Sequence, residues 1–132
     1  METAIDLMGG SGSRGVLLAR ELSDDPGSLT GRKVAAAAEA GDPVAQEAMG
    51  ELARWLGVGL AMVSDVFDPD LIVLSGGVGA SSRLFLDDAR EHFAQQLTGA
   101  KYRRKPRIRA TELGERAGML GAAALARDAV AR

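Results

Sequence analysis

The chain has 132 residues, of which 46% are hydrophobic and 26% charged; its formal net charge is −2, and it contains no cysteine. This balance is typical of one globular domain spanning residues 1–132, and it excludes disulfide frameworks, thiolate zinc sites and CxxC redox motifs. No apolar run approaches the ~20 residues of a membrane-spanning helix, and the N-terminus METAIDLMGG has no signal-peptide pattern, so we expect a cytoplasmic location and no membrane partner.

The chain begins with a segment, residues 1–15, whose GGSGSRG run has the composition of a flexible lead-in. Gly10, Gly12 and Gly15 in it fit the dinucleotide pattern G-x-G-x-x-G. That pattern needs a strand before it and an acidic residue about twenty positions later, and neither is convincing here. We therefore interpret it as a surface segment. A short helical pattern follows over residues 16–22, and an alanine-rich helix is predicted from Gly31 to Ala40.

The clearest element is a long helix that begins after Asp42. Asp42 is a suitable N-cap, and Pro43 suits the first helical position, where its missing N–H costs nothing. Gly57 and Gly59 weaken the helix by roughly 2 kcal/mol relative to alanine, which indicates that another backbone or a ligand lies close to them. Apolar residues recur along it at three- and four-residue spacing and predict one buried stripe, formed by Ala45, Ala48, Met49, Leu52, Leu56, Leu60, Val63 and Phe67.

The second half of the chain alternates strands and helices. Asp68-Pro69 ends the long helix, and the apolar run LIVL at 71–74 predicts a strand buried on both faces. A glycine turn over 75–79 and a second strand, RIRAT at 107–111, complete an α/β fold with a short parallel sheet and packed helices. Two helices, over 83–97 and 115–129, would bury Phe85, Ala89, Phe93 and Leu97 in the first and Met119, Leu120, Ala123 and Ala124 in the second.

The main candidate for a binding site is the glycine-rich segment after the first strand, formed by Ser75, Gly76, Gly77 and Val78. Glycines at the carboxyl end of a parallel strand allow a ligand to lie against bare backbone, and the next helix offers unpaired N–H groups to a phosphate. A nucleotide site is therefore plausible. The residues alone leave a glycine turn used only for chain reversal equally open.

The other polar residues indicate no catalytic set. Residues 1–100 carry 7 Lys and Arg against 15 Asp and Glu, whereas residues 101–132 carry 9 against 3, with six basic residues in 101–109. Because only Tyr102 accompanies them, we favour a solvated loop or a rim facing a polyanion over a nucleic-acid surface. Structural roles are favoured for the rest: an exposed helical position for His92, a core or interface anchor for Trp55, and capping or turns for Asp65, Asp68 and Asp70.

Three segments resemble the C-terminal part of ROK-family proteins, which are bacterial sugar kinases, notably glucokinases, and sugar-responsive repressors. The segments are LTGRKVAAAAEAGDPVA (29–45), ARWLGVGLAMVSDVFDPDLIVLSGGVGAS (53–81) and ATELGERAGMLGAAALAR (110–127), and the stretch from Ser11 to Leu22 is similar too. The resemblance implies an actin-like ATPase fold, with this chain forming part of the second, C-terminal domain. It also implies that ATP, accompanied by Mg, contacts the turn after the strand, where Ser75 replaces the first of three family glycines.

The resemblance also shows what this sequence lacks. Kinases of the family carry an N-terminal phosphate-binding DxGxT segment, a catalytic aspartate with sugar-binding neighbours, and a CxCGxxGCxE zinc element, and none of these motifs is present. The resemblance therefore implies no zinc site here, weak nucleotide binding, and no sugar phosphorylation by the chain alone. It also implies that the missing N-terminal half is a partner and that the chain forms a homo-oligomer. Three functions stay open: the nucleotide side of a glucokinase-type enzyme, the C-terminal part of a ROK repressor, and a non-catalytic association module.

Overall fold

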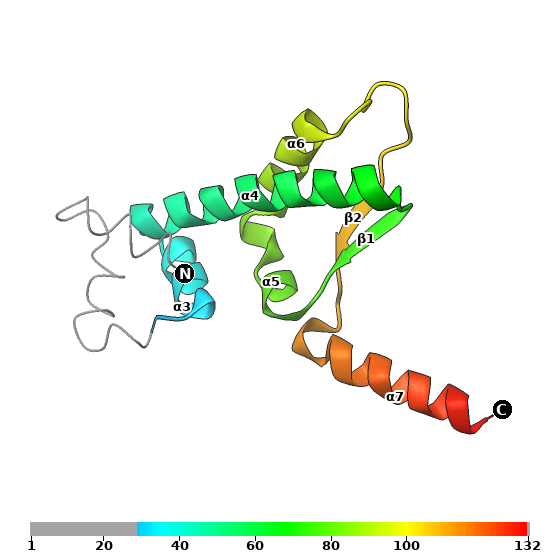
Figure 1. Cartoon of the computed structure of the whole chain (residues 1–132). Helices are drawn as coiled ribbons and strands as arrows, with labels where there is room; N and C mark the ends of the chain where they lie inside the picture. Colours follow the sequence, from blue (N-terminus) through cyan, green and yellow to red (C-terminus); the bar gives the residue numbers. More distant parts are fainter. Residues whose placement is uncertain (1–28, 132) are drawn as a thin grey trace.

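The structure is a computed structural model that describes residues 29–131, shown in Figure 1. The predicted lead-in over 1–15, the glycine pattern in it and the helical pattern over 16–22 lie outside these residues. The two strands pair in parallel, with Ile72 opposite Ile108, as the order of elements predicts. The elements are α3 (Gly31–Glu39), α4 (Pro43–Phe67), β1 (Leu71–Leu74), α5 (Gly76–Ala80), η2 (Ser82–Leu84), α6 (Leu86–Gln96), β2 (Arg107–Ala110), η3 (Gly114–Arg116) and α7 (Ala117–Val130).

The long helix α4 begins and ends where the sequence predicts. The buried carboxylate of Asp42 accepts hydrogen bonds from the N–H groups of Val44 and Ala45, both at 3.0 Å, so it satisfies two of the orphan donors of the first turn. At the other end Asp68 has a left-handed backbone with φ 43°, and its N–H donates to the carbonyl oxygen of Ser64. Helices α3 and α6 pack against this long helix (Figure 1).

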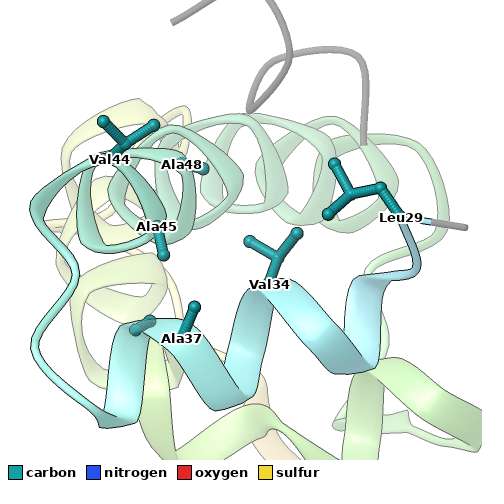
Figure 2. Packing of buried hydrophobic residues seen from close by; sticks show 7 residues of the cluster. Leu29, Val34, Ala37, Val44, Ala45 and Ala48 are labelled. Carbon is teal, nitrogen blue, oxygen red and sulfur yellow. The ribbon is translucent and has the colours of Figure 1, made fainter. Parts of the chain in front are cut away.

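Small apolar side chains form the core on both sides of α4. On one side α3 packs against the first turns of α4, and Figure 2 shows how valine and alanine side chains fill the space between the two helices. On the other side α6 lies along the middle of α4 and buries Phe85, Ala89, Phe93 and Leu97, the face predicted for this helix. The α3 side of the core consists of Leu29, Val34, Ala37, Ala38, Val44, Ala45 and Ala48.

Gly57 marks the point where α6 approaches α4 most closely. A Cβ atom at Gly57 would lie 2.5 Å from the Cβ of His92 and 2.8 Å from the carbonyl oxygen of Ala89. The expectation of a close backbone is therefore confirmed at Gly57. At Gly59 no atom of residues 29–131 lies within 4 Å of a built Cβ, so no described backbone lies close to it. His92 is half-buried by the same contact instead of fully exposed.

The predicted apolar faces of β1, α7 and the end of α4 are more exposed than expected. Leu71 and Val73 of β1 are 43% and 52% exposed, so the strand is not buried on both faces. Three members of the predicted stripe along α4, namely Leu52, Val63 and Phe67, are exposed. These faces are open because no described element lies over them.

The last helix, α7, extends away from the rest of the molecule (Figure 1). Its main contact is with η3, and none of its residues is buried. The prediction that Met119, Leu120, Ala123 and Ala124 face inward is therefore wrong for the described residues, because α7 has no packing partner there. None of the described helices is both long enough and apolar enough to cross a membrane.

Candidate functional site

A cavity of about 990 Å³ lies among α3, α4 and the segment formed by α5 and η2. Its volume is at the upper end of the ~300–1,000 Å³ range of small-molecule sites. Apolar side chains such as Met49, Leu52 and Phe85 line it, together with a few charged groups at its edges. An apolar pocket with a small number of polar groups is the usual arrangement for binding an organic ligand.

Each wall of the cavity comes from a different part of the sequence. The α4 wall includes Trp55, which is 59% exposed and therefore belongs to this surface instead of the core. The α3 wall includes Thr30, Gly31, Arg32, Val34, Ala35, Ala36 and Glu39, and the α5–η2 wall includes Gly77, Ala80, Ser81 and Arg83. In Figure 1 α3 and α5 both lie on the same side of α4, which brings these walls together.

Two ion pairs neutralise the carboxylates at the cavity. Glu39 pairs with Arg83 at 2.5 Å, and Glu51 pairs with Arg54 at 3.0 Å. The hydrogen bond from Arg54 lowers the pKa of Glu51, so both partners are charged at neutral pH. The guanidinium of Arg54 also lies 4.2 Å from the ring centroid of Trp55, a cation–π arrangement that restrains the indole at the cavity wall.

The glycines after β1 have three different roles. Gly76 has φ +70°, a left-handed backbone that favours glycine. Gly79 packs so tightly that a Cβ would lie 2.9 Å from the carbonyl oxygen of Leu74. Gly77 has neither constraint: its φ is ordinary and a Cβ would meet no atom within 4 Å, yet it lines the cavity. Chain reversal and packing therefore explain Gly76 and Gly79 but give no reason for glycine at position 77.

The predicted site residues do not all reach the cavity. Gly77 lines it, whereas Ser75 is the N-cap residue of α5 and makes no side-chain capping hydrogen bond. Gly76 begins α5, a five-residue helix that takes the place of the expected turn. Val78 lies in α5, but its side chain is outside the described part of the structure. The involvement of these four residues in binding stays a prediction.

Sequence reasoning missed the contribution of α3 to this cavity. Thr30, Glu39 and Arg83 lie on two walls, and about fifty residues separate the first from the last. Thr30 caps α3 through its hydroxyl, which accepts from the N–H of Lys33 at 3.3 Å. The sequence offered one signal, a glycine at position 31 beside this cap, but no spacing rule predicts that these segments meet.

The basic connection between α6 and β2 is anchored at the end of α4. Arg103 donates to Asp65 at 2.8 Å and to the carbonyl oxygen of Ser64 at 2.9 Å, and it also pairs with Asp68. Asp65 and Asp68 thus hold a loop, which agrees with the structural role predicted for them, while the connection is not entirely solvated. Within residues 29–131, no group of three or more His, Cys, Asp or Glu side chains is placed to hold a metal ion.

A model of the ROK family matches residues 13–129 of this sequence. The chain belongs to the ROK family. The glucokinase of Streptomyces coelicolor is 39% identical over 103 residues, which are 78% of this chain and 32% of that relative. The xylose repressor of Caldicellulosiruptor bescii is 28% identical over 97 residues, which are 74% of this chain and 24% of the repressor. This ROK chain thus spans about a third or less of the length of these relatives.

A solved ROK structure has the same fold over almost the whole chain. The crystal structure of a ROK family glucokinase from Streptomyces griseus in complex with glucose and AMPPNP superposes with a TM-score of 0.86 at 35% identity, covering 96% of this chain and 41% of that one. The fold class predicted from the resemblance is confirmed: the chain forms part of the actin-like ATPase fold of sugar kinases, with a short parallel sheet and packed helices.

Proposed function

We propose that this chain is the C-terminal, nucleotide-binding side of an ATP-dependent, glucokinase-type sugar kinase. The intact enzyme would transfer the terminal phosphoryl group of ATP to the 6-hydroxyl of its sugar. The observation that carries this proposal is Gly77, a cavity-lining glycine that no backbone or packing constraint among residues 29–131 requires. A ligand that lies against the bare Cα explains it. The Streptomyces griseus glucokinase, similar over 96% of this chain, was solved with AMPPNP.

The adenosine part of ATP fits the chemistry of the cavity. Its flat, largely apolar base suits walls formed by Met49, Leu52 and Phe85, with Trp55 at the exposed side. Backbone at Gly77 would contact the nucleoside, with Ser75, Gly76 and Val78 at its edge. Mg²⁺ would accompany the phosphates and neutralise their charge. The phosphates would extend toward the part of the kinase that this chain does not contain.

Phosphoryl transfer needs more than this chain offers. The motifs that supply the catalytic aspartate, the phosphate-binding segment and the sugar site in the family are absent from the sequence. We infer that residues 1–132 act as one domain on the nucleotide side, in the cytoplasm, and complete a kinase only with the N-terminal half of the fold. Alone, the chain would bind nucleotide weakly and would not phosphorylate glucose.

The second candidate function is the C-terminal part of a ROK-family repressor, favoured by the similarity to the xylose repressor of Caldicellulosiruptor bescii. The sequence encoded upstream of residue 1 distinguishes the two. A DxGxT segment and a catalytic aspartate would support the kinase, whereas a helix-turn-helix would support the repressor. Strong ATP binding by the full-length protein that carries this sequence would also favour the kinase.

Gly77→Val tests the nucleotide site. The added side chain would occupy the cavity where the nucleoside lies, so we expect ATP and ADP affinity to fall about tenfold or more, since a steric cost of 1–3 kcal/mol is usual for such intrusions. Calorimetry on the full-length protein that carries this sequence gives the affinities.

The matched control is Gly50→Val. Gly50 is also helical, also has no atom within 4 Å of a built Cβ, and does not line the cavity. The nucleotide affinity of the Gly50→Val variant should stay within twofold of that of the unaltered protein. Equal nucleotide affinity for the folded Gly77→Val variant and the unaltered protein would place the nucleotide elsewhere and leave this segment as a chain-reversal turn.

A further inference from the structure

One ion pair joins two cavity walls that are far apart in the sequence. Glu39 is the last residue of α3, and Arg83 lies in η2, 44 positions later; the Nη2 of Arg83 donates to the Oε1 of Glu39 at 2.5 Å. Both side chains line the cavity. The pair therefore connects the α3 wall directly to the η2 wall of the cavity.

The two walls otherwise belong to separate apolar clusters. The α3 wall is held by its small-residue cluster with the start of α4, whereas the α5–η2 wall is held through Phe85, which packs with Ala53 and Ala89. Met49 contacts both clusters, and no buried residue belongs to both. Both clusters include residues of α4, Ala45 and Ala48 in the first and Ala53 in the second, so α4 carries both walls. The ion pair is a direct polar link between the walls themselves.

We propose that the Glu39–Arg83 ion pair is a positioning device that sets the width of the cavity and so determines how well it fits the nucleoside part of the ligand. This rests on the proposed nucleotide site. The pair keeps the α3 wall and the α5–η2 wall at the spacing in which the cavity fits the nucleoside. Its action is geometric, because the two opposite charges largely cancel for a ligand at a distance.

The expected effect is modest, because the pair is partly in water. The Arg83 side chain is 71% exposed and that of Glu39 is 41% exposed. Exposed ion pairs contribute little, and the corresponding change in affinity is about two- to fivefold. High salt should weaken binding in the same direction, since it screens exposed charges.

The experiment compares adenosine with ATP in the unaltered 132-residue chain and in Glu39→Gln, Arg83→Gln and the double charge exchange Glu39→Arg/Arg83→Glu. The fluorescence of Trp55, the single tryptophan of the chain, reports on binding because this residue lines the same cavity. Both single variants should lower the affinities for adenosine and ATP by the same factor, and the charge exchange should restore both affinities. The control is Asp128→Asn, which removes the exposed Arg127–Asp128 pair of α7 and should change neither affinity.

Adenosine separates a geometric role from an electrostatic one, because it carries no phosphate. If Glu39→Gln leaves adenosine affinity unchanged, or raises ATP affinity alone by freeing the Arg83 charge, the positioning role is wrong. If the single variants bind normally while Gly77→Val weakens binding, the positioning role fails and the proposed function stands. If the unaltered chain binds neither adenosine nor ATP, both the positioning role and the nucleotide site in this chain are wrong.

Discussion

Gly57 lets α6 approach α4 to a distance that no side chain at this position would permit. The atoms around it are the Cβ of His92 and backbone atoms of Ala89 and Phe93, which are parts of a packed helix and have little freedom to move. Glycine costs about 1 kcal/mol of helix stability compared with alanine. At Gly57 this cost is offset by the close packing of the two helices, whereas at Gly59 no contact offsets it.

Alanine substitutions at these two positions should therefore have opposite effects. Gly57→Ala places a Cβ 2.5–2.8 Å from three atoms and should destabilise the chain by about 1–3 kcal/mol through overpacking. Gly59→Ala meets open space and should stabilise it by up to about 1 kcal/mol through helix propensity. Urea denaturation measures both free energies of unfolding. Equal shifts for the two variants would contradict the close approach at Gly57.

The sequence predicted that a backbone lies near these glycines but did not distinguish Gly57 from Gly59. The distinction depends on which side of α4 faces α6, and two residues along a helix are about 200° apart. The same limit applies after β1. The run of glycines indicated a special segment, but only the structure separates Gly76, with its left-handed backbone, and the tightly packed Gly79 from Gly77.

At the scale of elements, the connection between α6 and β2 depends on one side chain. Arg103 is 23% exposed and pairs with Asp65 and Asp68, at a point where α4 ends and the chain turns toward β1. It also donates to the carbonyl oxygen of Ser64, a hydrogen bond that satisfies an acceptor near the end of the helix. The loop, which carries Lys101, Arg104 and Lys105 beside Arg103, is thereby fixed against the acidic end of α4.

Arg103→Gln should destabilise the chain, whereas Arg104→Gln should not. Loss of the Arg103 contacts leaves two carboxylates close together without their cation, and we expect a cost of about 1 kcal/mol. Arg104 is 83% exposed and lies 3.8 Å from Asp70, so its replacement should stay within about 0.5 kcal/mol of the unaltered protein. Thermal unfolding of the two variants, side by side, provides the measurement; a more harmful Arg104→Gln would contradict this role of Arg103.

Elements whose signals are local were predicted well. The Asp42-Pro43 start of α4 and the buried face of α6 follow from capping chemistry and helical periodicity, which a single sequence contains. Among residues 29–131, the burial of β1 and α7 was predicted wrongly, because an apolar face indicates that another surface packs on it but does not identify that surface. The cavity was not predicted, because its walls meet only in three dimensions.

At the scale of the molecule, many large apolar side chains of residues 29–131 are exposed. They include Trp55, Met62, Val66 and Phe67 on α4, and Leu71 and Val73 on β1. Exposed apolar patches beyond a few hundred Å² are uncommon on monomeric proteins and mark contact surfaces. The chain covers 41% of the Streptomyces griseus glucokinase to which it is similar, so much of that fold has no counterpart here.

The isolated chain should therefore associate with itself. We expect a homodimer or a larger assembly at micromolar concentration, with the exposed part of α4 or α7 at the contact. Sedimentation velocity measures the size, and Val66→Ser with Phe67→Ser should shift the population toward monomer if α4 forms the contact. Both residues are 74% exposed, so the change should leave the core intact. A monomer that persists across this concentration range would contradict the expectation.

The exposure of α7 also determines how long its backbone hydrogen bonds last. A helix of 14 residues without buried side chains is not stabilised by packing, and isolated helices of that length are only marginally stable in water. Amide hydrogens of α7 should then exchange with solvent orders of magnitude faster than those in the middle of α4, whose opening requires loss of the core. Covering α7 with another polypeptide would slow that exchange, so the same amides would report when another part of the ROK fold, or a second copy of the chain, has docked.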